Sequence, residues 1–201
     1  LLRIGVKVTL LQRSEHILSK GDEDLARPVE SRFREEGMDL YTSTKILRAE
    51  KKPEGSVIYF EHEGKEKKVR AQYILQALGR RPNIDNLQLE SAKIETQKSC
   101  IPVDSKMKTN QPHIYAVGDV NGIHEVVHIA IQQGEIAGYN AINSENEREL
   151  DNRLKASVVF TDPGVASVGL SEKECQANNI AYLAASYSFD DHGKSMCLGE
   201  K

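Results

Sequence analysis

The densest cluster of residues able to do chemistry is His124–Glu125–Val126–Val127–His128, which has the form H-E-x-x-H. On a helix this spacing places two imidazoles one turn apart, where they can bind zinc beside a glutamate that acts as general base. A zinc peptidase also needs a third ligand, for which Glu145, Glu147 and Glu149 are available. However, His124 follows a Gly–Asp pair so closely that we expect it to precede the helix. Zinc metallopeptidase is therefore a remote alternative, and we predict no metal site.

Two further motifs come at the ends of predicted strands. Ala77–Asn83 (ALGRRPN) follows a strand predicted at Tyr73–Leu75, and Gly118–Asp119 ends a strand predicted at His113–Val117. The glycine lets the backbone approach a ligand, and the carboxylate can accept hydrogen bonds from sugar hydroxyls. The next helix begins nearby, and its N-terminus favours negative charge or acceptor oxygens. Ligands of open α/β sheets bind at such strand ends, so these motifs predict a ligand site.

The hydrophobic pattern of the first half predicts strands around one helix. The apolar run Val6–Leu11 is typical of a buried parallel strand. Asp22 offers an N-cap to a helix that ends near Glu36, and Gly37 is a plausible C-cap. From Met38 to Gln76 the period changes to two, which indicates antiparallel strands. These strands are expected at Lys45–Ala49, Val57–Phe60 and Lys68–Val69, with turns at 53–55 and 63–64.

The second half is predicted to contain a loop-rich stretch, one long helix and a small mixed unit. The long helix runs from about Val127 to Ile142, and its Gly134 and Gly138 would let another backbone approach closely. Residues 144–151 (SENERELD) form a charged linker. A capping box at Ser171–Glu174 opens a further helix. Strands are also expected at Ile101–Val103, Ser157–Phe160, Val165–Leu170 and Tyr182–Tyr187.

Composition narrows the class of protein. The chain has 201 residues, of which 39% are hydrophobic and 28% charged, with a formal net charge of −3. This charge gives no footprint for nucleic acid or an anionic membrane, and no apolar run approaches the roughly 20 residues that span a bilayer. Cys100, Cys175 and Cys197 form no C-x-x-C pair, which suits a reducing compartment. We therefore expect a cytoplasmic protein without nucleic acid or membrane partners.

Taken in order along the chain, the motifs resemble those of the pyridine nucleotide–disulfide oxidoreductase family, which includes dihydrolipoamide dehydrogenase, glutathione reductase and mercuric reductase. Ala77–Asn83 resembles the exit from the family's NAD(P) domain, and Tyr115–Asp119 resembles its second FAD-binding motif. Gly5–Leu11 is similar to the second strand of the NAD(P) domain, and Val158–Leu170 to the entry into the dimerisation domain. The resemblance implies an α/β chain, part of a flavoprotein fold with two dinucleotide-binding domains (FAD and NAD(P)) plus the start of an α+β dimerisation domain.

The resemblance also implies an order of domains and an activity. Residues 1–80 would end the NAD(P)-binding domain, 81–150 would form the second FAD-binding segment, and 151–201 would begin the dimerisation domain. The implied enzyme is an FAD-dependent NAD(P)H:disulfide oxidoreductase most similar to dihydrolipoamide dehydrogenase, with a mercuric-reductase-like flavoprotein as the alternative. It would pass electrons between nicotinamide, flavin and a redox disulfide. The implied partners are a small-molecule or lipoyl disulfide substrate and a second subunit in a homodimer.

Several family motifs do not occur in these residues. The C-x-x-x-x-C redox pair and the G-x-G-x-x-G fingerprint are missing, as is the family's catalytic histidine. Leu1–Gly5 reads like the end of a helix running into a strand, without an initiator Met. We therefore expect a partial chain, inactive by itself, and predict no catalytic residue within it.

The family's cofactor contacts fall on ten residues of this chain. Gly118 and Asp119 would contact the ribityl or pyrophosphate side of FAD. The isoalloxazine would be lined by Glu125, Val126, Val127 and His128, and the nicotinamide cofactor by Ile46 and Gly79. Members specific for NAD carry an acid at the end of the second strand, where this chain has Gln12 followed by Arg13. An arginine can clamp a 2′-phosphate, so Arg13 favours NADP over NAD.

Overall fold

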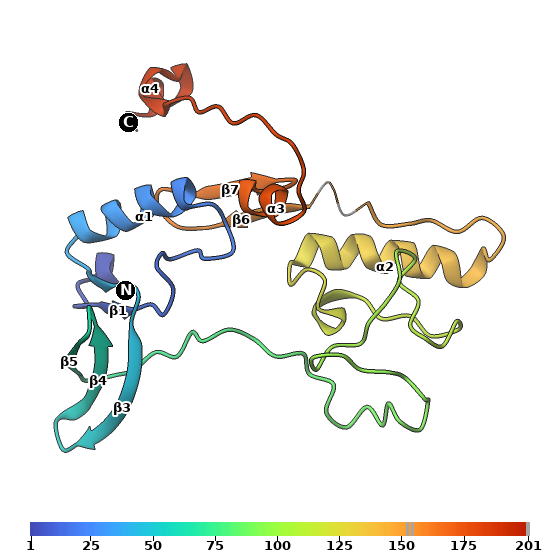
Figure 1. The fold of residues 1–201 in the computed structure, drawn as a ribbon, viewed down its shortest axis with the longest axis horizontal. Helices are drawn as coiled ribbons and strands as arrows, with labels where there is room; N and C mark the ends of the chain where they lie inside the picture. Colours follow the sequence, from blue (N-terminus) through green and yellow to red (C-terminus); the bar gives the residue numbers. More distant parts are fainter. Residues whose placement is uncertain (152, 154, 200–201) are drawn as a thin grey trace.

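The computed structural model describes every residue except 152, 154, 200 and 201, and the elements that precede residue 151 gather at two ends of the molecule (Figure 1). The β1 end comprises residues 1–71 and the α2 end residues 84–151, and an extended segment runs between them. The elements, in chain order, are β1 (Thr9–Leu11), α1 (Glu23–Glu35), β2 (Asp39–Tyr41), β3 (Lys45–Lys52), β4 (Gly55–His62), β5 (Lys65–Ala71), α2 (Val127–Ile142), β6 (Ala156–Val159), β7 (Val165–Val168), α3 (Glu172–Ala177) and α4 (Gly193–Leu198).

At the β1 end, α1 packs on a short parallel pair of strands. β1 and β2 pair in parallel from Thr9–Asp39 to Leu11–Tyr41. Ala26 and Val29 of α1 bury against Ile17, with Leu10, Phe33 and Leu40 packed around them. The helix predicted to begin after Asp22 is confirmed, and Gly37 follows it with a φ of 92°. The strand predicted at Val6–Leu11 is shorter than expected, because Val6 is exposed and only Thr9–Leu11 finds a partner strand.

The antiparallel strands β3, β4 and β5 form a meander beside this pair. β4 is central, and its Val57, Ile58 and Phe60 are buried. Phe60 meets the ring of Tyr41 edge-on at a centroid distance of 5.2 Å, which joins the meander to β2. Glu63 and Gly64 adopt positive φ at the second turn. The predicted antiparallel strands and both turns are confirmed.

At the α2 end, one helix organises long loops. Ile136 and Ala137 of α2 pack with Met107 and Leu150, and Val103 and Tyr115 close the cluster. The side chain of Asn140 donates to the backbone carbonyls of Lys106 and Arg148 and accepts from the Arg148 N–H, which fixes the loop after the helix. The predicted helix bounds are confirmed. None of the described helices has the length and apolar character needed to cross a membrane.

The antiparallel pair β6–β7 and the helix α3 lie against α1 (Figure 1). The predicted capping box is present, since Ser171 accepts from the Glu174 N–H and Glu174 accepts from the Ser171 N–H. Asp22 behaves differently from its prediction. Its carboxylate does not cap its own helix α1 but accepts from the N–H groups of Glu172 and Lys173 at the start of α3. Residues 150 positions apart are thereby joined.

Several predicted strands are wrong. The structure forms no strand at Tyr73–Leu75, Ile101–Val103, His113–Val117 or Tyr182–Tyr187. Their apolar composition indicates strands, but a strand needs a neighbour that pairs its backbone. Tyr73 is 89% exposed, and His113–Val117 contributes only an isolated bridge between Tyr115 and Lys108. The expectation for Gly134 and Gly138 is also wrong, because a Cβ at either position would meet open space.

Candidate functional site

The Gly118–Asp119 motif forms a tight turn held by α2. Gly118 begins a 3-10 helix, Gly118–Asn121, with a φ of 75° that an L side chain rarely adopts. A Cβ at Gly118 would also lie 3.3 Å from the Cβ of Ala130. The fully buried side chain of Gln133 accepts hydrogen bonds from the Gly118 N–H at 2.7 Å and from the Asn121 amide at 2.8 Å. The turn that carries Asp119 is therefore set by the middle of α2.

Arg80 connects the two motifs that the sequence singled out. Its guanidinium forms an ion pair with Asp119 at 2.9 Å and donates to the backbone carbonyl of Glu125 at 2.7 Å. The Glu125 carboxylate lies 3.5 Å from the same guanidinium. These three residues line an open cleft of about 340 Å³ together with Arg81, Pro82 and Asn83. The Asp119 side chain is 48% exposed, so it stays accessible to a ligand.

The start of α2 leaves backbone donors beside this cleft. The N-cap residue Val126 makes no side-chain cap, so the first N–H groups of the helix lack a side-chain acceptor. Val127 is 77% exposed. Such an end attracts anions and acceptor oxygens. The imidazole Nε2 of His128 is engaged elsewhere, 2.9 Å from the carbonyl oxygen of Ala156.

The H-E-x-x-H sequence does not build a zinc site. His124 lies before α2, as predicted, so the two imidazoles are not one helical turn apart. Burial lowers the pKa of His124, and the charge of Lys155 lowers it further. Within the described part of the chain, no three His, Cys, Asp or Glu side chains gather where they could bind a metal ion.

Three of the four predicted nicotinamide contacts lie at the β1 end. Gln12 follows β1 directly; its N–H donates to the Tyr41 carbonyl, and its own carbonyl accepts from the N–H and hydroxyl of Thr44. Arg13 comes next and is exposed. Ile46 is 53% exposed on β3, beside the register shift between Ile46 and Arg48. Gly79, with a φ of 106°, belongs to the extended segment between the two ends. The structure thus brings Gly118, Asp119 and Glu125 together and keeps Gln12, Arg13 and Ile46 at the other end (Figure 1).

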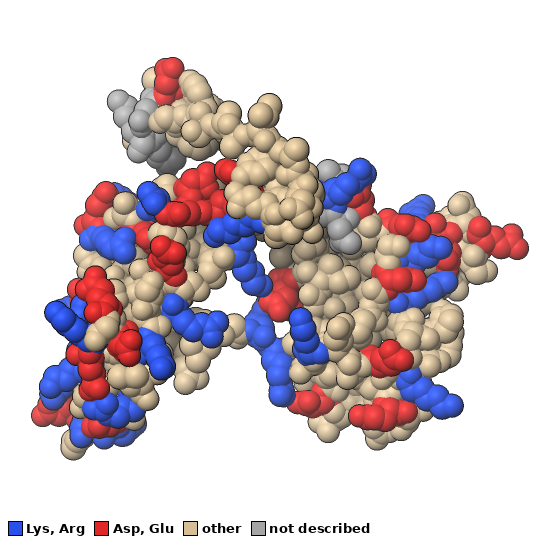
Figure 2. All heavy atoms as spheres, in the orientation of Figure 1, with Lys and Arg blue, Asp and Glu red and all other residues tan. Residues whose placement is uncertain are grey.

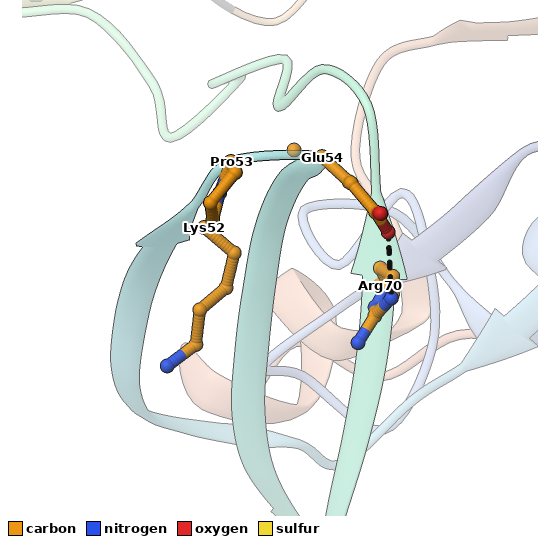
Figure 3. Close-up of a pocket in the computed structure, with 5 residues that line it drawn as sticks. Lys52, Pro53, Glu54 and Arg70 are labelled. Atoms are coloured by element: carbon orange, nitrogen blue, oxygen red, sulfur yellow. Dashed lines mark hydrogen bonds and ion pairs between the residues drawn. The ribbon is translucent and has the colours of Figure 1, made fainter.

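A second hollow, at the turn between β3 and β4, offers no comparable chemistry. It is lined by Lys52, Pro53, Glu54, Gly55 and Arg70, and the Glu54–Arg70 ion pair at 3.4 Å spans it (Figure 3). Both side chains are more than two thirds exposed. Figure 2 shows acidic and basic side chains interspersed over the visible face, without a large patch of one sign.

Comparison with known proteins assigns the chain to a family. Residues 1–134 match the model of the family described as "Pyridine nucleotide-disulphide oxidoreductase". The chain belongs to this family. The resemblance inferred from the sequence motifs is therefore confirmed, and enzymes of this kind use FAD and NAD(P)H.

Individual relatives agree with the family assignment. A dihydrolipoyl dehydrogenase of Bacillus subtilis is 33% identical over 198 residues, which cover 98% of this chain and 42% of that protein. A mercuric reductase of Staphylococcus aureus is 33% identical over 174 residues, 86% of this chain and 32% of that protein. The chain spans about two fifths of the length of the dihydrolipoyl dehydrogenases it matches.

Solved structures confirm the predicted α/β fold class. The crystal structure of LpdA from Mycobacterium tuberculosis superposes with a TM-score of 0.85 at 26% identity, over the whole of this chain and 43% of that one. The flavoprotein disulfide reductase RclA of Escherichia coli gives a TM-score of 0.81 at 22% identity and supports the fold alone.

Two residues of the site were missed by sequence reasoning. Arg80 lies inside a motif that was recognised, but a strand-end pattern does not reveal that its guanidinium reaches Asp119, 39 positions away. No sequence motif singles out Gln133. Helical spacing places Gln133 on the face of α2 that buries Ile129 and Ile136, and this was the available signal; the donors that it accepts from are set by the fold.

Proposed function

We propose that the chain forms part of an FAD-dependent NAD(P)H:disulfide oxidoreductase of the dihydrolipoamide dehydrogenase kind. The observation that carries the proposal is the Gly118–Asp119 turn, which lies beside the uncapped N-terminus of α2 and is joined to the Ala77–Asn83 motif by Arg80. The proposed domain order has residues 1–80 completing an NAD(P)-binding domain, 81–150 serving FAD and 151–201 beginning a dimerisation domain.

The residues at the α2 end fit one side of FAD. Asp119 offers a half-exposed carboxylate to a hydroxyl, and the first turn of α2 offers N–H groups without a side-chain acceptor to oxygen atoms. Gly118 removes the Cβ that would crowd Ala130. Glu125, Val126, Val127 and His128 would lie beside the ring. When bound, the flavin supplies two-electron transfer between a nicotinamide and a disulfide. This chain's contribution is to hold and orient it.

At the β1 end, we propose that Gln12 and Arg13 bind the adenosine ribose of the nicotinamide cofactor, with Ile46 and Gly79 further along it. Arg13 would pair with a 2′-phosphate, which favours NADPH over NADH. The three cysteines, Cys100, Cys175 and Cys197, are all free thiols, so this chain supplies no redox disulfide. We therefore expect the disulfide substrate to react at residues of the whole protein that lie outside this chain. We also propose that the whole protein is a homodimer and that it is cytoplasmic. A mercuric-reductase-like activity is the second candidate, since the mercuric reductase and the dihydrolipoyl dehydrogenase described above are both 33% identical to this chain.

Flavin binding tests the proposal. In a chain of full family length that carries these residues, Asp119→Ala should reduce the flavin absorbance that remains after dialysis. Asp85→Ala is the matched control, because Asp85 is an exposed carboxylate whose ion pair is with Arg81, on the same segment. The 201-residue chain alone should bind FAD weakly, since each hydrogen bond in an open site nets only about 0.5–1.5 kcal/mol. Full flavin occupancy of the Asp119→Ala protein would overturn the assignment of Asp119.

A further inference from the structure

Glu30 is a buried carboxylate that the proposed function does not use. It lies on the face of α1 that packs into the β1 end, next to Val29 and one turn after Ala26, and is only 5% exposed. A buried carboxylate is costly unless it is hydrogen-bonded and paired. The contacts of the Glu30 carboxylate therefore indicate its role.

The contacts of Glu30 point to the loop after β1. One carboxylate oxygen accepts the backbone N–H of Ile17 at 2.9 Å in a buried position. The imidazole of His16 lies 3.4 Å away and also reaches Glu23 at 3.1 Å. From the same helix, the guanidinium of Arg34 lies 3.5 Å from the Glu30 carboxylate. Glu30 thus fixes the C-terminal side of the loop, residues 12–17.

The other side of this loop is fixed by Ser43 and Thr44, which lie between β2 and β3. The Gln12 carbonyl accepts from the Thr44 N–H and from its hydroxyl, each at 3.0 Å. The Ser14 carbonyl accepts from the Ser43 N–H at 2.9 Å. Backbone anchors therefore lie on both sides of Arg13, whereas the Arg13 side chain makes no hydrogen bond or ion pair among the described residues. These hydrogen bonds hold the loop around an exposed guanidinium that has no ion-pair partner within the described ranges.

We propose that Glu30 is a positioning residue for nucleotide selection, which acts through Arg13. This inference rests on the proposed nicotinamide site and adds the residue that makes it selective. A guanidinium on an ordered backbone binds a phosphate without first paying to order the loop. Glu30 orders the loop through its buried hydrogen bond to Ile17, while Arg13 makes the contact with the phosphate. The ligand chemistry is a ribose 2′-phosphate.

The test compares two small probes on the 201-residue chain by NMR titration, adenosine 2′-monophosphate and adenosine 5′-monophosphate. The native chain should bind the 2′-isomer more tightly, with shifts at the amides of residues 12–17. Glu30→Leu keeps the volume of the buried side chain but leaves the Ile17 N–H without an acceptor. It should weaken binding of the 2′-isomer about three- to tenfold while leaving the 5′-isomer unchanged. Glu35→Leu, at an exposed position of the same helix, is the matched control and should change neither.

Glu30→Gln separates positioning from folding. Its amide oxygen can still accept from Ile17, but the charge that faces His16 is lost, so we expect an intermediate loss of about two- to threefold. This variant decides the question if Glu30→Leu fails to fold. A native chain that prefers the 2′-isomer, with the preference intact in both variants, overturns the inference and leaves the proposed function standing. A native chain that does not prefer the 2′-isomer overturns both the inference and the NADPH assignment.

Discussion

At both ends of the molecule, a buried side-chain acceptor holds a segment that carries a charged residue, but the two charged residues differ in their pairing. At the β1 end, a buried acceptor on α1, Glu30, holds the loop that carries Arg13; at the α2 end, a buried acceptor on α2, Gln133, holds the turn that carries Asp119. Arg13 is left unpaired among the described residues, whereas Asp119 is already paired with Arg80. A ligand at the β1 end meets a free charge. A ligand at the α2 end must share Asp119 with Arg80 or displace it.

Separate cores imply that each end can be disrupted alone. Phe60 and Met107 are almost fully buried, one at each end. Truncation of either should destabilise its own end by about 3–5 kcal/mol for Phe60→Ala and about 2–5 kcal/mol for Met107→Ala. Amide hydrogen exchange should show lost protection in β4 for the first variant and in α2 for the second. Equal loss of protection at both ends in either variant would show one cooperative core and break the comparison.

The free charge at the β1 end predicts the next largest effect. In a chain of full family length that carries these residues, Arg13→Ala should raise the apparent KM for NADPH with little change for NADH. Loss of a charge-assisted contact to phosphate costs about 1.5–3 kcal/mol, which corresponds to roughly 10- to 150-fold. Arg27→Ala is the control, because Arg27 is exposed and pairs with Glu23 on the same helix. Equal use of both nucleotides by the unmodified enzyme would contradict the assignment.

The sequence predicted those parts of the fold whose information is local. The long helix and the capping box at Ser171 follow from periodicity and capping residues, and both were found where expected. The apolar segments Tyr73–Leu75 and Tyr182–Tyr187 were predicted as strands because apolar composition indicates burial. Composition does not show whether a neighbouring strand is present to pair with the backbone. Asp22 was predicted to cap the nearest helix, but its carboxylate reaches α3 instead, a contact that only tertiary structure creates.

For the candidate site, sequence motifs predicted the Gly118–Asp119 turn beside the cleft and missed the residues that hold or pair with the proposed contacts. Gly118 and Asp119 stand in a recognisable pattern, because the backbone turn itself requires a glycine. Glu30, Arg80 and Gln133 act through distances set by packing, and their residue types are common on helices and loops. Helical spacing places Glu30 and Gln133 beside buried apolar positions of their helices, but the backbone groups that they contact are known only once the chain is folded.

Gln133 gives the α2-end counterpart of the Glu30 test. Gln133→Leu would leave the N–H of Gly118 and the amide of Asn121 without their acceptor, at a cost of roughly 1–3 kcal/mol. The leucine also removes the buried Nε2 of Gln133, which has no hydrogen-bond partner in the described part of the chain, so the lower half of that range is expected. Gln132→Leu is the exposed control beside it. Chemical denaturation measures the stability. An unchanged midpoint would show that the Gly118–Asn121 turn is stable without its hydrogen bonds to Gln133.

The smallest effect is on the pH dependence of stability, and it concerns Glu174 of α3. Lys155 and the Ser171 N–H lower the pKa of Glu174 from 4.5 to about 2. Because the folded-state pKa is the lower one, the carboxylate stabilises the fold above about pH 4.5, and this contribution disappears as the pH falls from about 5 towards 2. The side chain is 39% exposed, so solvent screens the pair and Glu174→Gln should cost less than about 1 kcal/mol at pH 7. Thermal unfolding followed from pH 7 to pH 2 should show a shallower decline for Glu174→Gln than for the native chain, while Glu35→Gln, at an exposed position of α1, keeps the native slope. Parallel curves for all three proteins would mean that α3 is held by its backbone contacts with Asp22 and not by the charge of Glu174.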